Sequence, residues 1–275
     1  MIGFALLCLL ILACEGTGSA APEPSGKPKP GLPSSMAALG DSITAGYGSC
    51  PAYVACTRNS WSTGSSATVD SHYDRILAGN PTIKGQAHNY SVPGARAADL
   101  TGQAARAVSA KVGYVTILIG ANDACAGQVQ DMTAIGTFRT QIDAALAALK
   151  KGLPKARILV VSIPDVYRLW QVGHDDPAAV RAWDRGICPS MLARATSTAD
   201  ADADRRRRVD ARIGAYNDAL AAACRAYEKR CRWDGGGAHN VRFTLDLVNK
   251  TDYFHPNTAG QRELADATYP GRFTW

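Results

Sequence analysis

Residues 114–120 read Tyr-Val-Thr-Ile-Leu-Ile-Gly, a run of β-branched and apolar side chains that ends at a glycine. A second run of this kind, Arg-Ile-Leu-Val-Val-Ser-Ile at residues 157–163, ends directly before Pro164. Continuous apolar runs of this length are typical of strands that are buried on both faces of a parallel sheet. The two runs therefore predict two strands of such a sheet.

On either side of these runs the sequence alternates between strand and helix patterns. Residues 35–40 predict a first strand, and residues 88–92 and 241–247 are weaker strand candidates. Alanine-rich stretches at 97–111 and 137–151 predict helices between the strands. This alternation predicts a doubly wound α/β sheet, in which the chemistry lies at the carboxyl ends of the strands.

The N-terminal residues predict export. Residues 4–13 are apolar but too short to span a bilayer, as in a signal peptide. Residues 11–14 resemble a bacterial lipobox, in which Cys14 would be lipidated, whereas residues 18–20 offer an ordinary cleavage site; both remain open. We therefore expect a signal at 1–20, a flexible Pro- and Gly-rich linker at 21–35 and a single domain at 36–275.

Composition restricts the class of partner. Hydrophobic residues make up 46% of the 275 residues and charged residues 20%, which is ordinary for a globular protein. The formal net charge of +6 is too small to predict nucleic-acid binding. The one dense basic run, residues 205–208, is interpreted as a solvated loop or helix face.

Six cysteines remain once Cys8 and Cys14 are assigned to the signal, and an even number in an exported chain predicts disulfides. No C-x-x-C pair and no suitably spaced histidine supports a zinc site. Six cysteines allow fifteen pairings. Closeness in sequence favours two local pairs, and the third pair would tie down the long segment 167–208. The expected pairs are Cys50–Cys56, Cys224–Cys231 and Cys125–Cys188.

Three short segments place polar or glycine residues after predicted strands. Ser42 ends a Gly-Asp-Ser turn after the first strand, where a serine projects into the crevice of the sheet. Gly94 lies in a Val-Pro-Gly-Ala turn and lets the backbone approach a substrate closely. Asn122 follows the run at 114–120; its amide suits an oxyanion, and a helix cap is the structural alternative.

A fourth segment, residues 252–257, reads Asp-Tyr-Phe-His-Pro-Asn and precedes a predicted last helix at 258–268. Asp252 lies three residues before His255, and a carboxylate at that spacing in a loop can hold the imidazole Nδ1. The other histidines lack such a setting and are interpreted as structural or solvated.

Taken together and in this order, the four segments resemble the GDSL, or SGNH, hydrolase family over residues 40–267. Ile43 stands where the family name expects leucine, and it would pack behind the turn. Residues 40–46, 119–125 and 162–165 look like the phospholipase B-like and actinobacterial esterase/lipase branch. The resemblance implies a three-layer α/β/α sandwich, flavodoxin-like, with a five-stranded parallel sheet.

The resemblance also implies roles for single residues. Ser42 matches the nucleophile, His255 the general base and Asp252 its orienter. The backbone N–H groups of Ser42 and Gly94 and the amide of Asn122 match an oxyanion hole. No metal or organic cofactor is implied.

The expected function is therefore a secreted or cell-envelope esterase or lipase that cleaves carboxylic acyl esters through an acyl-enzyme. A carbohydrate O-acetyl esterase is the alternative. A third hypothesis is an inactive cell-surface binding module, but such a module would not need Ser42, His255 and Asp252 to be intact. We expect a monomer with a small-molecule or lipid ester substrate. The segment 167–208 forms either part of the substrate wall or a structural insertion.

Overall fold

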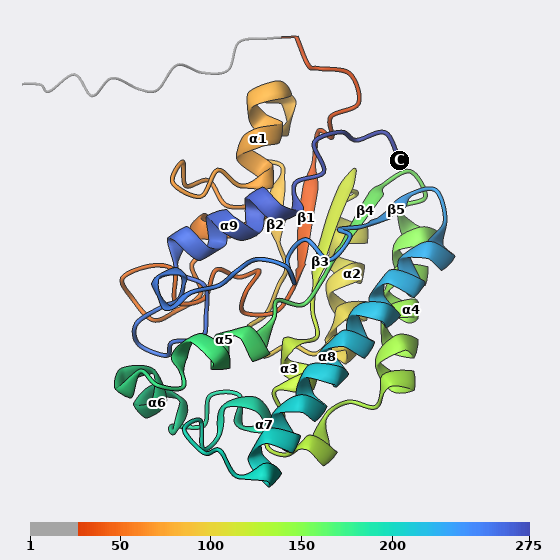
Figure 1. Ribbon diagram of the computed structural model, residues 1–275. Coiled ribbons are helices and arrows are strands. Elements are labelled where there is room, and N and C mark those ends of the chain that lie inside the picture. Colours follow the sequence, from red (N-terminus) through yellow and green to blue (C-terminus); the bar gives the residue numbers. More distant parts are fainter. Residues whose placement is uncertain (1–26) are drawn as a thin grey trace, which may run out of the picture.

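The computed structural model describes residues 27–275 and centres on a five-stranded parallel sheet with the order β2-β1-β3-β4-β5 (Figure 1). Gly40 pairs with Leu118, and Leu118 pairs with Val161, so the three central strands end at the same level. The strands are β1 (Met36–Gly40), β2 (Ala87–Asn89), β3 (Tyr114–Leu118), β4 (Arg157–Val161) and β5 (Cys231–Trp233).

Helices cover both faces of the sheet, which makes the three-layer α/β sandwich that the sequence predicts (Figure 1). One face carries α1 (His72–Gly79) and α9 (Thr258–Thr268), which begin at the capping residues Ser71 and Asn257. The other face carries α2 (Leu100–Ser109), α4 (Ile135–Gly152) and α8 (Asp200–Tyr227). No helix among residues 27–275 is long and apolar enough to cross a bilayer.

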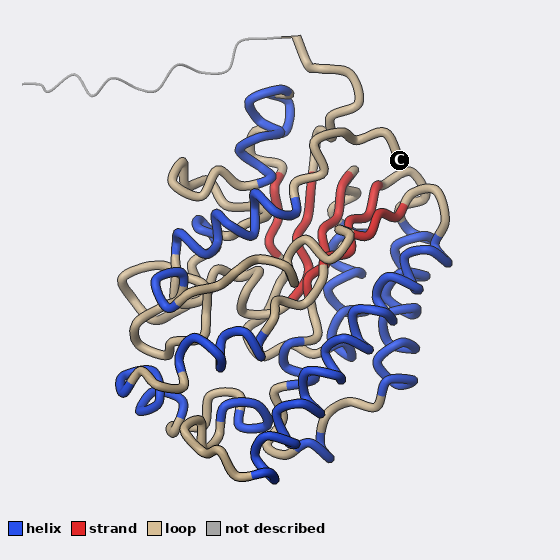
Figure 2. The backbone as a smooth tube through the Cα atoms, in the orientation of Figure 1, coloured by secondary structure: helices blue, strands red, loops and turns tan. Residues whose placement is uncertain are grey.

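The loops that follow the strands gather at one end of the sheet, together with short helices (Figure 2). Three of these helices, α5 (Val166–Gly173), α6 (Pro177–Trp183) and α7 (Pro189–Leu192), form the segment that follows β4. The fourth, α3 (Ala121–Ala124), follows β3. The sheet therefore presents the ends of β1, β3 and β4 to one cluster of loops.

One strand prediction is wrong. Residues 241–247 form no strand, because Val241 and Phe243 are buried in irregular chain and Leu245–Leu247 form a 3₁₀ turn. The fifth strand is β5, of whose three residues none is buried, and it carries no apolar run. It pairs with β4 through Ile158 and Cys231.

The basic run at 205–208 lies on α8 and is only half solvated, which corrects its interpretation as a solvated face. The Arg206 side chain is buried, with its guanidinium 4.3 Å from the ring centre of Trp170 and a bond to Ser197 O at 2.7 Å. Arg205 donates to Ser190 O at 2.5 Å. The segment 167–208 folds over this part of α8, and two of the arginines hold it there.

Three disulfides join Cys50 to Cys56, Cys125 to Cys188 and Cys224 to Cys231, the pairings expected from the sequence. The second of these ties α7 to the chain after α3, and the third brings the end of α8 to β5. The sulfur bridges of the second and third pairs lie partly in the core, since Cys188 and Cys224 are buried there.

The expected signal at 1–20, including Cys14, lies outside the described residues. Within the expected linker, Lys29 N donates to Gly79 O at 2.8 Å, and Leu32 packs partly buried against the core. The chain therefore contacts the domain before β1 begins.

Candidate active site

A glycine at the end of β1 brings Ser42 to the carboxyl edge of the sheet. Gly40 has φ +149°, and a Cβ there would lie 2.2 Å from Leu118 O, so no other residue fits. Buried Gln103 on α2 clamps this residue: Gly40 N donates to Oε1 at 2.7 Å, and Nε2 donates to Gly40 O at 2.9 Å. Ser42 follows and is 7% exposed.

Ser42, His255 and Asp252 lie in one chain of hydrogen bonds. The Ser42 Oγ is 2.8 Å from His255 Nε2, and His255 Nδ1 is 2.5 Å from Asp252 Oδ2. Asp252 Oδ1 accepts the backbone N–H groups of Phe254 at 2.9 Å and of His255 at 3.2 Å. Burial alone would raise the pKa of Asp252, but the hydrogen bond and charge of His255 and the bond from Tyr53 outweigh it, so this pKa is lowered.

The loop that carries Asp252 and His255 is braced by the segment after β4. Tyr253 has a left-handed φ of +52°, which costs a non-glycine residue conformational energy. The indole N–H of Trp183, at the end of α6, donates to Tyr253 O at 3.0 Å. Arg185 Nη2 donates to Thr251 O at 2.6 Å. These two bonds fix the backbone of the loop directly before and after Asp252.

Gly94 lies at the third position of a β-turn closed by a bond from Ala95 N to Val92 O at 3.0 Å. Its φ of +83° is what such a turn requires there, and Pro93 before it suits the second position. Within residues 27–275, neither the N–H of Gly94 nor that of Ser42 donates to a protein acceptor. Both are therefore free to bind a substrate oxygen.

Asn122 and Asp123 tie the end of β3 to the Gly94 turn. Asn122 Nδ2 donates to Ala95 O at 2.9 Å, which uses one of its two hydrogens. Asp123 Oδ2 accepts Ala97 N at 3.0 Å. The N-cap of α3 is Gly120, with no capping side chain, so Asn122 does not act as the helix cap that the sequence left open. The role of Asp123 was not predicted, although it follows Asn122 directly.

Asp41, directly before Ser42, is fully buried. Its Oδ1 accepts Ile43 N at 2.9 Å, whereas Oδ2 is buried with no partner in the described part of the chain. Burial raises the pKa of Asp41 to about 7. A second buried carboxyl, that of Asp123, also has its pKa raised by burial. Two buried acids, one directly before Ser42 and one directly after Asn122, thus have raised pKa values.

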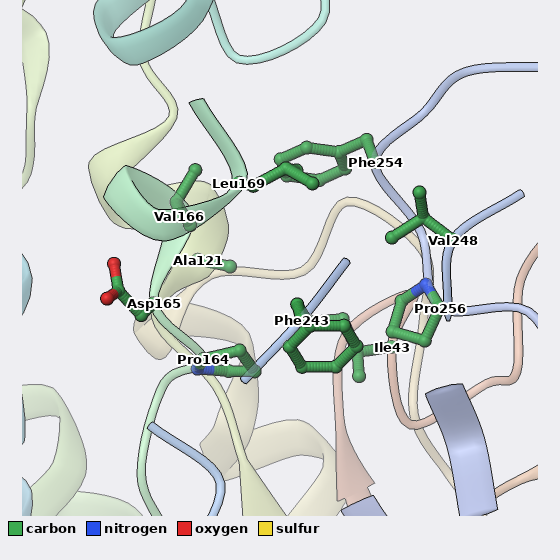
Figure 3. Close-up of a pocket in the computed structure, with 10 residues that line it drawn as sticks. All are labelled: Ile43, Ala121, Pro164, Asp165, Val166, Leu169, Phe243, Val248, Phe254 and Pro256. Carbon is green, nitrogen blue, oxygen red and sulfur yellow. The ribbon is translucent and has the colours of Figure 1, made fainter. Parts of the chain in front are cut away.

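An apolar pocket opens beside these residues (Figure 3). The space between its atoms, counted out into the open solvent, is about 420 Å³, and about 30 Å³ of it can hold the centre of a water-sized sphere. Phe254 and Leu169 face Phe243 and Ile43 across it, and the Asp165 carboxylate points away (Figure 3). The lining residues are Ile43, Ala121, Pro164, Asp165, Val166, Leu169, Phe243, Val248, Phe254 and Pro256. Four of them, Ile43, Ala121, Phe254 and Pro256, are sequence neighbours of Ser42, Asn122 or His255, so the pocket adjoins the polar cluster.

The segment 167–208 contributes to the pocket and is tied down by a disulfide. Leu169 of α5 lines the pocket, and Cys188 is bonded to Cys125.

Among residues 27–275, His, Cys, Asp and Glu side chains form no group of three or more that could hold a metal ion. His72 is buried between Tyr114 and Thr268, and burial lowers its pKa to about 3, which fits a structural histidine.

Comparisons with known proteins give the family. The model of the GDSL-like lipase/acylhydrolase family matches residues 38–263. The membrane-associated phospholipase B1 of Rattus norvegicus is 27% identical over 201 residues, which are 60% of this chain and 14% of the phospholipase. The chain thus spans a small part of that relative's length. The extracellular lipase of Streptomyces rimosus has a TM-score of 0.50 and 17% identity, over 85% of this chain and 97% of the lipase, which shows a shared fold.

Proposed function

Since the chain belongs to the GDSL-like lipase/acylhydrolase family, we propose that it is a carboxylic ester hydrolase that cleaves acyl esters through Ser42, His255 and Asp252. The observation that supports these roles is the unbroken chain of hydrogen bonds from Ser42 Oγ through His255 to the Asp252 carboxylate, with links of 2.8 and 2.5 Å. A serine hydroxyl is a weak nucleophile and needs a base within hydrogen-bond reach.

In the proposed first step, Ser42 Oγ attacks the carbonyl carbon of the ester while His255 Nε2 takes its proton. Asp252 holds the Nδ1–H and stabilises the imidazolium that forms. His255 then gives the proton to the leaving alcohol, which leaves an acyl-enzyme on Ser42. Water repeats the sequence and releases the carboxylic acid and the free Ser42 hydroxyl.

The negative charge on the tetrahedral oxygen would be stabilised by three donors. These are the backbone N–H groups of Ser42 and Gly94 and the second hydrogen of Asn122 Nδ2. The bonds from Asn122 to Ala95 and from Ala97 to Asp123 support this role, because they hold the Gly94 turn against Asn122. Donors that are fixed before the reaction need no reorganisation as charge develops.

The apolar pocket is the proposed site of the acyl chain. Ten lining residues, nine of them without a charged group, favour an alkyl chain over the bare methyl of an acetyl ester. This favours an esterase or lipase over a carbohydrate O-acetyl esterase. An inactive binding module would not need the bond between Ser42 and His255.

We further propose that the enzyme works outside the cytoplasm, in the medium or on the cell envelope. Three disulfides support an oxidising compartment, because cytoplasmic proteins rarely keep them. A lipid on Cys14 would distinguish the envelope from the medium, and mass spectrometry of the exported N-terminus tests for it.

Turnover of p-nitrophenyl acyl esters from acetyl to palmitoyl tests the proposal. We expect the wild type to prefer chains longer than acetyl and Ser42→Ala to lose turnover while melting at the wild-type temperature. A preference for the acetyl ester would instead support a carbohydrate O-acetyl esterase. Equal turnover by Ser42→Ala would reject Ser42 as the nucleophile.

A further inference from the structure

A tyrosine from a disulfide-closed loop contacts the carboxylate of the triad. Tyr53 lies between Cys50 and Cys56, which are bonded to each other, and its hydroxyl donates to Asp252 Oδ2 at 2.7 Å. The same oxygen lies 2.5 Å from His255 Nδ1. Tyr53 and Asp252 are 199 residues apart in the sequence, so only the fold brings this contact about.

We propose that Tyr53 is a positioning residue that holds the Asp252 carboxylate and reduces the negative charge it presents to His255. The proposal rests on the proposed function, since it assigns Tyr53 a part in the work of the triad. Asp252 Oδ1 is already held by two backbone N–H groups, those of Phe254 and His255. Without Tyr53, Oδ2 would keep the His255 bond alone.

The surroundings of Tyr53 favour a fixed hydroxyl. Its ring meets that of Tyr47 edge-on at 4.9 Å between centres, and the Tyr47 ring lies 5.0 Å from that of His255. The loop is pinned on its other side, because Gly48 N donates to Val54 O at 3.0 Å. Although Tyr53 is 37% exposed, burial of the rest and the bond to Asp252 raise its pKa, so the hydroxyl stays a donor.

A hydrogen bond to a carboxylate withdraws part of its charge. An Asp252 that shares its charge with Tyr53 therefore stabilises the imidazolium of His255 less than a carboxylate without this bond. Removing the hydroxyl should favour the imidazolium in the free enzyme, and a protonated imidazole cannot act as a base. The other titratable and charged groups around the pair are Asp41, Tyr47 and Arg185, and Tyr53→Phe leaves all three in place.

The experiment compares pH profiles of kcat/KM for Tyr53→Phe and wild type on p-nitrophenyl butyrate. We expect the acid limb of Tyr53→Phe to move up by about half a pH unit and kcat to fall about threefold to tenfold, with KM nearly unchanged. Tyr47→Phe is the matched control, because it removes a neighbouring hydroxyl for which no bond is present among the described residues. Its acid limb should coincide with that of wild type.

A spectroscopic readout separates this proposal from the proposed function. The proton between His255 Nδ1 and Asp252 should move downfield in the ¹H spectrum of Tyr53→Phe, whether or not an ester is turned over. Loss of turnover in Ser42→Ala tests the function independently. If Tyr53→Phe melts lower but keeps both the wild-type acid limb and the wild-type proton shift, Tyr53 is only a packing residue and the proposal is overturned.

Discussion

At the scale of single residues, two roles of Asn122 can be measured separately: the structural bond to Ala95 and the proposed binding of the oxyanion. Its side-chain amide has two hydrogens. One is bonded to Ala95 O, which fixes the side chain and leaves the second hydrogen available to another acceptor. Asp123, one residue later, fixes the same loop through Ala97 N. The Gly94 turn therefore keeps one of its two tethers when Asn122 is replaced.

We predict that Asn122→Ala lowers kcat by about a hundredfold to a thousandfold, because the proposed oxyanion hole would lose one donor. KM should change little, since the bond strengthens only as charge develops on the oxygen. Asn122→Asp should be slower still, as an ionised carboxylate has no donor. The test is kcat on a soluble ester, with the amount of folded protein determined by thermal melts. A kcat of Asn122→Ala within about threefold of wild type would mean that Asn122 only tethers Ala95.

Asp41 predicts a pH dependence of stability. Its pKa is raised from 3.8 to about 7 by burial, so the folded state binds a proton that the unfolded chain has released. This contribution to stability is full below about pH 4 and is lost as the pH rises through about 7. Asp41→Asn keeps the acceptor for Ile43 N but cannot ionise.

We therefore expect the melting temperature of Asp41→Asn, relative to that of wild type, to rise as the pH is raised from 5 to 8. The gain should correspond to a free energy on the order of a few kcal/mol at the upper end. Calorimetric scans at four or five pH values measure it. A constant difference across this range would mean that the Asp41 carboxyl is ionised throughout.

At the scale of elements, α5 connects the long insertion to the apolar pocket. Val166, in its first turn, lines the apolar pocket together with Leu169. We predict that Val166→Phe lowers kcat/KM for octanoyl and longer esters at least about tenfold while changing that for acetyl esters less than about threefold. Gln171→Phe adds the same ring on an exposed position of α5 and should leave the series unchanged. A uniform loss across all chain lengths would place the acyl chain elsewhere.

The elements that could be predicted from the sequence are those with local signals. The strands at 114–118 and 157–161 are buried on both faces, and their continuous runs of apolar residues predict this burial. Strand β5 has no such composition, since it is three residues long and exists through its pairing with β4. Residues 241–247 imitate a strand because Val241 and Phe243 are buried against other parts of the core.

The same distinction applies to the candidate site. Asp252 and His255 are three residues apart in one loop, so their contact could be predicted from spacing. Gln103 and Tyr53 meet their partners across 63 and 199 residues, and no local pattern encodes contacts of that kind. Arg206 looked like surface charge because a run of four arginines carries no sign of the aromatic ring that later covers one of them.

At the scale of the whole molecule, the disulfides should differ in what they contribute to stability. Cys125 and Cys188 are 63 residues apart, whereas Cys50 and Cys56 are separated by 6. By loop entropy alone, replacing the first pair with alanines should lower the free energy of unfolding by about 4 kcal/mol and replacing the second by about 2 kcal/mol. Denaturant titration of the two double variants measures the order, and an equal or reversed loss would contradict it.

The bond between Ser42 and His255 joins residues 213 positions apart, one near each end of the chain. A ribosome therefore makes the proposed nucleophile about 10 to 40 s before the proposed base at ordinary rates of synthesis. During that interval the growing chain holds Ser42 without the imidazole that we propose activates it. If the proposed roles are correct, a nascent or prematurely terminated chain that lacks His255 should hydrolyse no esters.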